Sequence, residues 1–217
     1  MNAPKLRLKG HSSDWKPATL YQYISEIKRK APAGSSAPVM MIAAASGFIE
    51  QSQRYSADNA GSSLANYTLL KEGELAYNHG FSNIRHYGSC FDLRVPEARV
   101  PFVYHAFSVN DGNPRFFGHY LNCGLFDKQL RTMVASTARM DGLLNIAFET
   151  YSGLSIKLPP IDEQEDIAAF FDNLNATLSN KEDYIESLKI LKTCCLCHLF
   201  CIGGGGRTEY PLNRLYR

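Results

Sequence analysis

The sequence predicts an α+β fold in which a globular domain is followed by a long C-terminal helix. Short runs of apolar and β-branched residues come first, two helical patterns lie near residues 115–135, and one more strand follows. Between Ile161 and Phe200 the chain has no proline or glycine. A helix over that segment would be roughly 58 Å long at about 1.5 Å per residue, which exceeds the width of a small domain.

The elements of the globular domain are predicted in chain order. An amphipathic helix is expected from Thr19 to Lys30. Strands are expected in five runs bounded by Gly, Asn or Pro: residues 39–45, 67–70, 75–77, 90–93 and 100–109. Pro114 ends a turn cluster and suits the first position of a helix. Residues 126–135 form a second helical stretch, and residues 154–158 alternate as a closing strand.

The long helix opens at Leu158-Pro159-Pro160, because proline lacks an amide donor and restricts the residue before it. Asp162 then suits the N-cap, with Glu165 three residues later. Apolar residues follow at alternating steps of three and four, interrupted by Lys181 and Lys192: Ile167, Phe171, Leu174, Leu178, Ile185, Leu188, Cys195 and Leu199. This period favours a coiled coil, and hence a homodimer through the helix. The alternative is an amphipathic helix packed on its own domain.

Three segments are therefore predicted: a globular domain at residues 1–158, a long helix at 159–201 and a flexible tail at 202–217, which begins near four glycines. The composition, 45% apolar and 20% charged, is that of an ordinary globular protein. Six cysteines without a secretory signal indicate reduced thiols in a cytoplasmic protein. The longest apolar run, residues 39–45, is too short to span a membrane.

The net charge of +2 is unevenly distributed. Residues 1–160 hold 17 Lys and Arg against 12 Asp and Glu, whereas residues 161–217 hold 6 against 9. A mildly basic domain suits a modest number of phosphate contacts, and the acidic helix is not expected to lie along DNA.

The junction into the helix also resembles a known family. Residues 156–171 read Ile-Lys-Leu-Pro-Pro-Ile-Asp-Glu-Gln-Glu-Asp-Ile-Ala-Ala-Phe-Phe, similar to the specificity subunit of type I restriction-modification enzymes. Residues 4–10 with Asp14-Trp15 resemble the opening of a target-recognition domain in that family, and residues 46–49, 67–78 and 138–139 add weaker similarity. The resemblance runs from about residue 4 to residue 200, and the Leu-Pro-Pro…Glu-Gln junction is its strongest part.

The resemblance implies a DNA-binding subunit that reads one half of a bipartite site. The helix would then set the distance between two recognition domains and dock methyltransferase (modification) subunits and, through them, the restriction subunit. Full-length members carry two recognition domains and two long helices, whereas this chain has one of each, as a half-length form would.

No catalytic role is expected for the chain itself. The Asn/Asp-Pro-Pro-aromatic motif of adenine methyltransferases is absent, and so are glycine-rich cofactor loops, P-loops and HExxH motifs. No cofactor is predicted. Cys194, Cys197, His198 and Cys201 share a helical face, but thiols that are buried or face a partner are favoured over a metal site, because one helix rarely supplies all the ligands.

DNA contacts require Arg or Lys for phosphates and guanines, and Asn or Gln for adenines. The candidates are Arg54, Tyr77, Asn78, Asn83, Arg85, His86, Lys128, Arg131 and Arg139. For any single candidate a solvated surface role remains open, whereas the polar stretch at residues 77–86 is favoured as a unit. Two other functions also remain open: a free-standing DNA-binding or decoy protein, and a helical adaptor whose globular part binds protein.

Overall fold

The structure of the chain is a computed structural model, which describes residues 4, 6–51, 66–80, 82–134, 144 and 146–199, with the backbone alone for 196–199. The chain divides into two compact units, one ending at Phe171 and one beginning at Asp172. The predicted α+β class with a long C-terminal helix is confirmed. Several predictions lie outside the described residues: the contacts of Arg54 and Arg139, the side chains of Cys197, His198 and Leu199, the residue Cys201, and the tail at residues 202–217.

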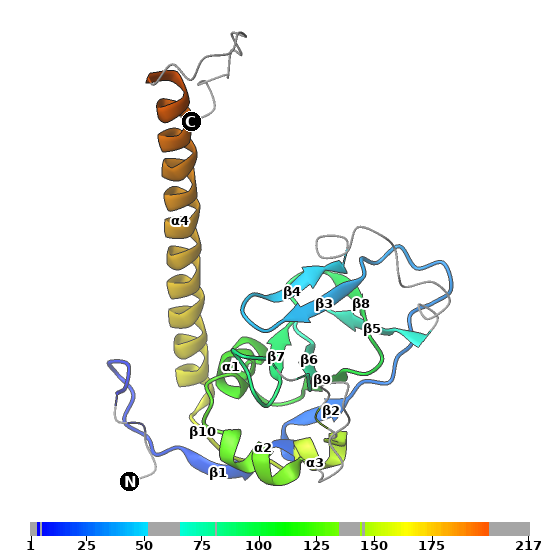
Figure 1. The fold of residues 1–217 in the computed structure, drawn as a ribbon. Helices are drawn as coiled ribbons and strands as arrows, with labels where there is room; N and C mark the ends of the chain where they lie inside the picture. Colours follow the sequence, from blue (N-terminus) through cyan, green and yellow to red (C-terminus); the bar gives the residue numbers. More distant parts are fainter. Residues whose placement is uncertain are drawn as a thin grey trace. The chain divides into compact units, whose positions relative to one another are not determined.

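The first unit is built on a four-stranded antiparallel sheet (Figure 1). Its strands, in spatial order, are β2 (Ile24–Glu26), β9 (His105–Val109), β6 (Leu75–Asn78) and β7 (Ser89–Asp92). The register places Leu75 of β6 between Phe107 of β9 and Asp92 of β7.

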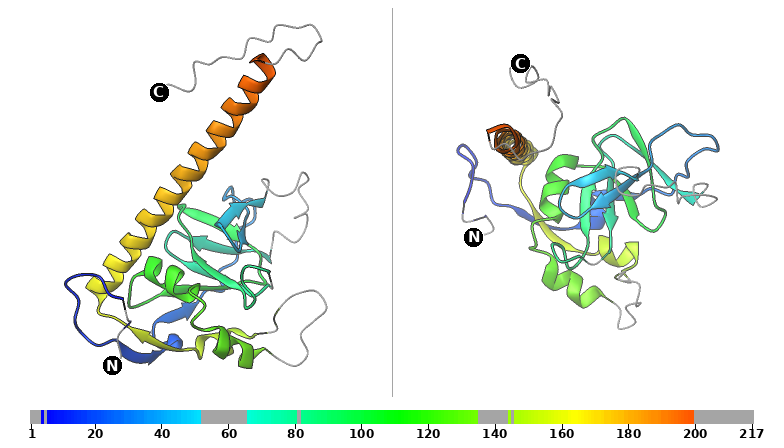
Figure 2. Two further views of the ribbon diagram at one scale, coloured as in Figure 1. Left: turned by 60° about the vertical axis from the view of Figure 1, so that its left-hand side comes forward. Right: turned by 45° about the horizontal axis from the view of Figure 1, so that its top comes forward.

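Three antiparallel strand pairs make up the rest of the sheet structure in the part of the chain that the structure describes. They are β1 (Lys16–Thr19) with β10 (Ser155–Leu158), β3 (Met40–Ala43) with β4 (Gly47–Glu50), and β5 (Thr68–Lys71) with β8 (Glu97–Val100). Both views in Figure 2 show β1 and β10 side by side at the start of the long helix. The pairing of β1 with β10 therefore brings residues near both ends of the first unit together.

The sheet is buried on both faces, because successive side chains of a strand point to opposite sides. In β6, Leu75 and Tyr77 belong to one core cluster and Ala76 to another; in β9, Phe107 and Ala106 divide in the same way. Helices cover the first face, and β3, β5 and β8 contribute to the core on the second.

The helices of the first unit are short. They are α1 (Pro114–Leu121), α2 (Asp127–Met133) and α3 (Phe148–Ser152), with a 3-10 turn, η1, at Leu20–Gln22. Pro114 occupies the first turn of α1 as predicted, and the Asn113 side chain accepts a hydrogen bond from the Phe116 amide at 3.1 Å. The long helix, α4, runs from Ile161 to Leu199.

The predicted helix at residues 19–30 is wrong. This segment forms η1 and then β2, whose Ile24 pairs with Val109 of β9. The Leu20 amide also bonds the Leu154 carbonyl at 2.9 Å, so distant partners take the backbone groups that a helix would use. Aromatic and β-branched residues favour helix only weakly, and tertiary pairing overrides the apolar spacing.

Two other local predictions need correction. The strand expected at residues 100–109 is split into β8 and β9, because Pro101 opens a turn in which the Tyr104 amide bonds its carbonyl at 3.0 Å. Asp162 is not the N-cap of α4: the first helical bond joins the Gln164 amide to the Pro160 carbonyl at 3.1 Å. Asp162 instead lies in the first turn, where its negative charge interacts favourably with the positive end of the helix dipole.

Within the described ranges, no helix is both long enough and apolar enough to cross a membrane.

Candidate nucleic-acid interface

The polar stretch at residues 77–86 begins with side chains that point into the protein. Tyr77 is 2% exposed, and its ring stacks on Tyr151 with centroids 4.0 Å apart. Burial raises the pKa of Tyr77, so its hydroxyl stays protonated and donates a hydrogen bond to the Tyr87 carbonyl at 2.6 Å. Tyr77 is therefore too deeply buried for direct contact with DNA, and its role is to anchor the loop.

Asn78 and His79 also make contacts inside the fold. The Asn78 side chain accepts from the Gly80 amide at 3.0 Å and donates to the Ile42 carbonyl at 3.4 Å. The two ring nitrogens of His79 lie 2.6 Å from the Leu144 carbonyl oxygen and 2.7 Å from that of Val103. Both side chains are half-buried, so this part of the stretch shapes the loop and is not presented to solvent.

The second part of the stretch is a tight turn from Ser82 to Arg85. The Ser82 amide donates to the Arg85 carbonyl at 3.0 Å, and the Arg85 amide donates to the Ser82 hydroxyl at 2.9 Å. Asn83 and Ile84, the two residues between them, are exposed, and so is His86. The turn therefore presents a short tip to solvent on a hydrogen-bonded base.

Gly88 fixes where this loop joins β7. Its φ is +82°, and an added Cβ would lie 2.5 Å from the Asn78 carbonyl oxygen and 2.7 Å from the Tyr77 ring. No other residue type fits this position without moving the strand end or the anchoring tyrosine.

The loop and α2 meet around a pocket of about 220 Å³. From the loop it is lined by residues 83–88, and from the helices by residues that include Asn122, Asp127 and Leu130. The Arg85 Nε atom is buried and has no hydrogen-bond partner among the residues that the structure describes. A guanidinium nitrogen left in this state favours an added acceptor, such as a phosphate or carbonyl oxygen.

Two predicted basic contacts, Lys128 and Arg131, lie one turn apart on α2 and are both exposed. Leu130, between them, is buried in the core and holds the helix to the domain. Asp127 and Leu130 line the pocket together with Asn83, Arg85 and His86. The structure thus places Asn83, Arg85 and His86 at the pocket and Lys128 and Arg131 on the helix that borders it. Tyr77 and Asn78 make their contacts inside the fold.

One exposed apolar side chain at this surface was not predicted from the sequence: Ile84, which lines the pocket and is 63% exposed. One local signal was available for Ile84. It stands among Ser, Asn and Arg in a turn, where small polar residues and glycine are favoured.

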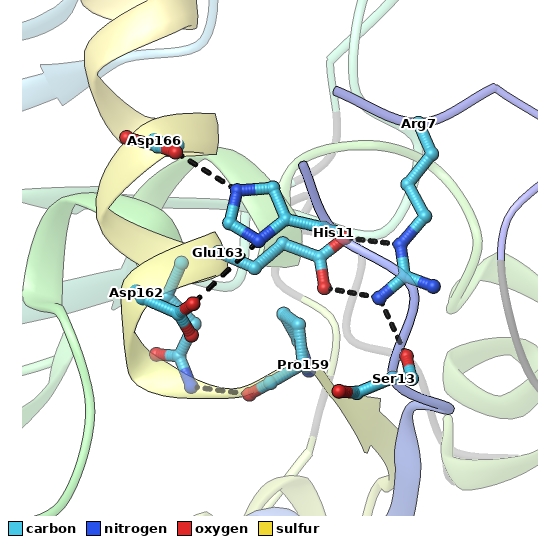
Figure 3. A network of polar contacts seen from close by, with 8 residues as sticks. Arg7, His11, Ser13, Pro159, Asp162, Glu163 and Asp166 are labelled. Atoms are coloured by element: carbon cyan, nitrogen blue, oxygen red, sulfur yellow. Dashed lines mark hydrogen bonds and ion pairs between the residues drawn. The ribbon is translucent and has the colours of Figure 1, made fainter. Parts of the chain in front are cut away.

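The Leu-Pro-Pro…Glu-Gln junction is a clasp formed by Arg7, Asn113, Pro159, Glu163 and Gln164 (Figure 3 shows its Arg7 and Pro159 sides). Arg7 Nε and Nη2 donate to the two Glu163 carboxylate oxygens at 2.7 and 2.6 Å. This guanidinium holds the pKa of the Glu163 carboxyl below its ordinary value. Gln164 accepts from the Asn113 amide and donates to the Pro159 carbonyl, each at 3.0 Å.

A histidine adds to this clasp. His11 Nε2 lies 2.8 Å from an Asp166 carboxylate oxygen, and its Nδ1 lies 3.7 Å from one of Asp162 (Figure 3). The clasp therefore ties the N-terminal segment, the cap of α1 and the first turns of α4 to one another. It has a structural role, and its two central residues, Glu163 and Gln164, are buried.

The predicted dimerisation residues fall into two groups. Ile167 packs against the core of the first unit, and Phe171 lies 5.4 Å from His119 between ring centroids, so both contact their own domain. Leu174, Leu178, Ile185 and Leu188, here called the apolar stripe, are between 42% and 53% exposed. The Leu199 side chain lies outside the described residues. The first part of the helix thus packs on its own domain, and the coiled-coil interpretation of the second part stays a prediction.

No protein-family model matches the sequence, and no curated protein matches it. Among solved structures, the fold is similar to one chain of a structure that explains complex assembly and conformational transition of the type I R-M (restriction-modification) system. The TM-score is 0.52 at 12% identity, covering 95% of this chain and 53% of that chain. A second similar structure is the HsdS subunit from Thermoanaerobacter tengcongensis, with a TM-score of 0.45 at 15% identity, covering 82% of this chain and 41% of that one.

The first of these likenesses shows the fold of a type I R-M component, globular domain and long helix together. The chain spans about half the length of the structures it matches.

Proposed function

We propose that this chain is a sequence-specific DNA-binding specificity subunit of a type I restriction-modification system, in a half-length form that reads one half of a bipartite site. The observation that carries the proposal is the fold likeness to a type I R-M component over 95% of the chain. The resemblance at residues 156–171, read from the sequence alone, points to the same family.

The interface described above supports DNA as the ligand. Arg85, Lys128 and Arg131 supply cations for phosphates or guanine, and the exposed amide of Asn83 suits an adenine edge. In protein–DNA interfaces, contacts to phosphates usually orient the protein, and a few polar side chains read the base sequence.

The apolar stripe supports a homodimer through α4. A second helix would cover four large apolar side chains at coiled-coil spacing and remove them from water, which is favourable.

The charge distribution along α4 favours an antiparallel arrangement of the two helices. Residues 161–175 carry five Asp or Glu and no Lys or Arg, whereas residues 187–199 carry two Lys and no Asp or Glu. Antiparallel pairing places the acidic start of one helix near the basic end of the other, and parallel pairing places like charges together.

The same helix would dock methyltransferase subunits, and methyl transfer and cleavage would belong to the partner subunits. Pure protein is therefore expected to transfer no methyl group by itself. With a purified modification subunit and S-adenosylmethionine, methyl incorporation into duplex DNA should appear and depend on this chain.

The proposal is tested in two steps. Selection of bound duplexes from a random pool should recover a defined motif, and capture by salt-sensitive binding alone, without a motif, would contradict a specificity role. Adding modification subunits should then give methylation at that motif. A motif without any methylation would favour the free-standing binding or decoy protein, and absence of DNA binding would favour the protein-binding adaptor.

The cysteines near the end of α4 test the orientation of the helices. In an antiparallel pair Cys194 and Cys195 of the two copies lie at opposite ends, beyond the roughly 7 Å between Cα atoms that a disulfide allows. Mild oxidation of the dimer should leave it free of interchain disulfides. A disulfide-linked dimer that disappears on Cys195→Ser would support a parallel pair instead.

A further inference from the structure

The Ser82–Arg85 turn presents its two central side chains on a firm base. Three hydrogen bonds join Ser82 and Arg85: amide to carbonyl at 3.0 Å, amide to hydroxyl at 2.9 Å, and hydroxyl to carbonyl at 3.3 Å. Behind the turn, Tyr77 holds the Tyr87 carbonyl at 2.6 Å. The tip is therefore ordered before any ligand arrives, which reduces the entropy lost on binding.

The residue at the second tip position is not one that the turn itself favours. Ile84 is β-branched, 63% exposed, and stands where glycine, Asn, Asp or Ser is usual. Ile84 lines the pocket together with Arg85, and α2, which also lines it through Asp127 and Leu130, carries the exposed Lys128 and Arg131. An apolar side chain held out from a cationic surface suits a ligand that has both negative charge and an apolar group.

We propose that the Asn83–Ile84 tip reads an A·T base pair in the DNA major groove. The Asn83 amide donates to adenine N7 and accepts from adenine N6, and the Ile84 side chain packs on the thymine C5-methyl group. These are the contacts by which amide and apolar side chains distinguish A·T from the other pairs in that groove. The inference rests on the proposed function and adds the identity of one base pair and the residues that select it.

The spacing of the two tip residues, Asn83 and Ile84, matches that of the two bases in one base pair. Adjacent residues have Cα atoms about 3.8 Å apart, so two neighbouring side chains can meet the two bases of one pair. Arg85, Lys128 and Arg131 would meanwhile contact phosphates, which orient the protein without reading sequence. The tip then decides base preference, and the basic residues decide the salt-dependent part of the affinity.

The test uses two duplex pools with the same 30 randomised positions, one made with thymidine and one with deoxyuridine, which lacks the methyl group. The full chain should bind selected duplexes from the thymidine pool more tightly than the same sequences with deoxyuridine, by about fourfold for each half-site that it contacts, the equivalent of one buried methyl group per half-site. Ile84→Ala should remove this difference and retain the salt dependence. Asn83→Ala should lose the adenine at one position of each half-site of the selected motif and leave the other positions unchanged.

Two control variants make the result decisive. Ile84→Val keeps a branched apolar side chain and should keep most of the methyl preference. Leu125→Ala truncates another exposed apolar residue, which lies between α1 and α2 and does not line the pocket, and should leave the preference intact. Equal binding of both pools by the wild type, or equal loss of preference in the Leu125 and Ile84 variants, would overturn the inference. If the chain still selects a defined motif and binds it in a salt-sensitive way, the proposed function stands even when either of these outcomes overturns the inference.

Discussion

Arg7 and Glu163, which are 156 positions apart in the sequence, form a two-point ion pair with distances of 2.7 and 2.6 Å. The Glu163 side chain is only 1% exposed, so its charge depends on this partner. The contact explains why an acidic residue stands in the Leu-Pro-Pro…Glu-Gln junction, next to the buried Gln164.

The ion pair predicts how stability depends on pH. The Glu163 carboxyl has a lowered pKa in the folded protein, mainly through its bonds with Arg7, so folding favours its charged form. Its contribution to stability is then fully present above the ordinary carboxyl pKa of 4.5 and is lost as the pH falls through the lower folded value. Glu163→Gln should be less stable than wild type at pH 7, and the difference should shrink at acidic pH. Urea unfolding followed by fluorescence of Trp15, the single tryptophan, measures this. The exposed neighbour Glu165 provides the control: Glu165→Gln should leave the profile unchanged.

A second prediction compares two glutamines whose side chains each make two hydrogen bonds to the backbone, one inside the clasp and one at the surface. Gln164→Ala leaves the part-buried Asn113 amide and the buried Pro159 carbonyl without their partner. It should cost at least about 2 kcal/mol, since each unmet buried group costs about 1–3 kcal/mol. Gln129 makes the same number of bonds, to the amide and carbonyl of Ser155, both at 2.9 Å, but in an exposed setting. Gln129→Ala should therefore cost less than about 1 kcal/mol. Equal losses in urea unfolding would contradict the structural role of the clasp.

The apolar stripe predicts the oligomeric state. Leu174→Glu with Leu188→Glu should convert a dimer to monomers, because the two carboxylates would be buried in the helix pair. Light scattering at tens of micromolar gives the mass. The matched control, Ala176→Glu with Ser179→Glu, adds the same charge on the opposite side of the heptad and should remain dimeric. A monomeric wild type at this concentration would rule out the dimer.

The interface predicts a specific change in salt dependence. Arg85→Ala and Arg131→Ala should each weaken DNA binding and lower the slope of log affinity against log salt by about 1, as expected for one lost phosphate contact. Lys28→Ala removes one positive charge from an exposed residue outside this surface and should leave the slope unchanged. If the Lys28 variant lowers the slope as much as the arginine variants, the contact surface lies elsewhere.

The symmetry of the proposed dimer predicts the form of the DNA target. Two identical chains related by a two-fold axis present the same surface to both half-sites, so the selected motif should be an interrupted palindrome. Deleting one heptad, residues 175–181, shortens the helix by about 10 Å, or about three base pairs at ~3.4 Å each. The deletion should shift the spacer or abolish binding without altering the half-site sequence. An asymmetric motif selected by this chain alone would exclude the symmetric dimer.

The sequence alone determined the features that depend on local chemistry. Pro159 and Pro160 marked the start of α4, and Pro114 marked the start of α1. Short apolar runs bounded by Gly, Asn or Pro, and the alternation at residues 154–158, located most strands to within a few positions. These signals are local because proline geometry and side-chain alternation act on the residues that carry them.

Only the tertiary structure decided which residues face inward and which face solvent. Within one polar stretch, Tyr77 is held in the core by Tyr151, while Ile84 is displayed on a turn closed by Ser82 and Arg85. Residues near 19–30 became η1 and β2 because β9 and Leu154 supplied backbone partners. Such outcomes depend on groups far away in the chain, and burial and hydrogen-bond pairing with those groups outweigh the small local preferences that a sequence displays.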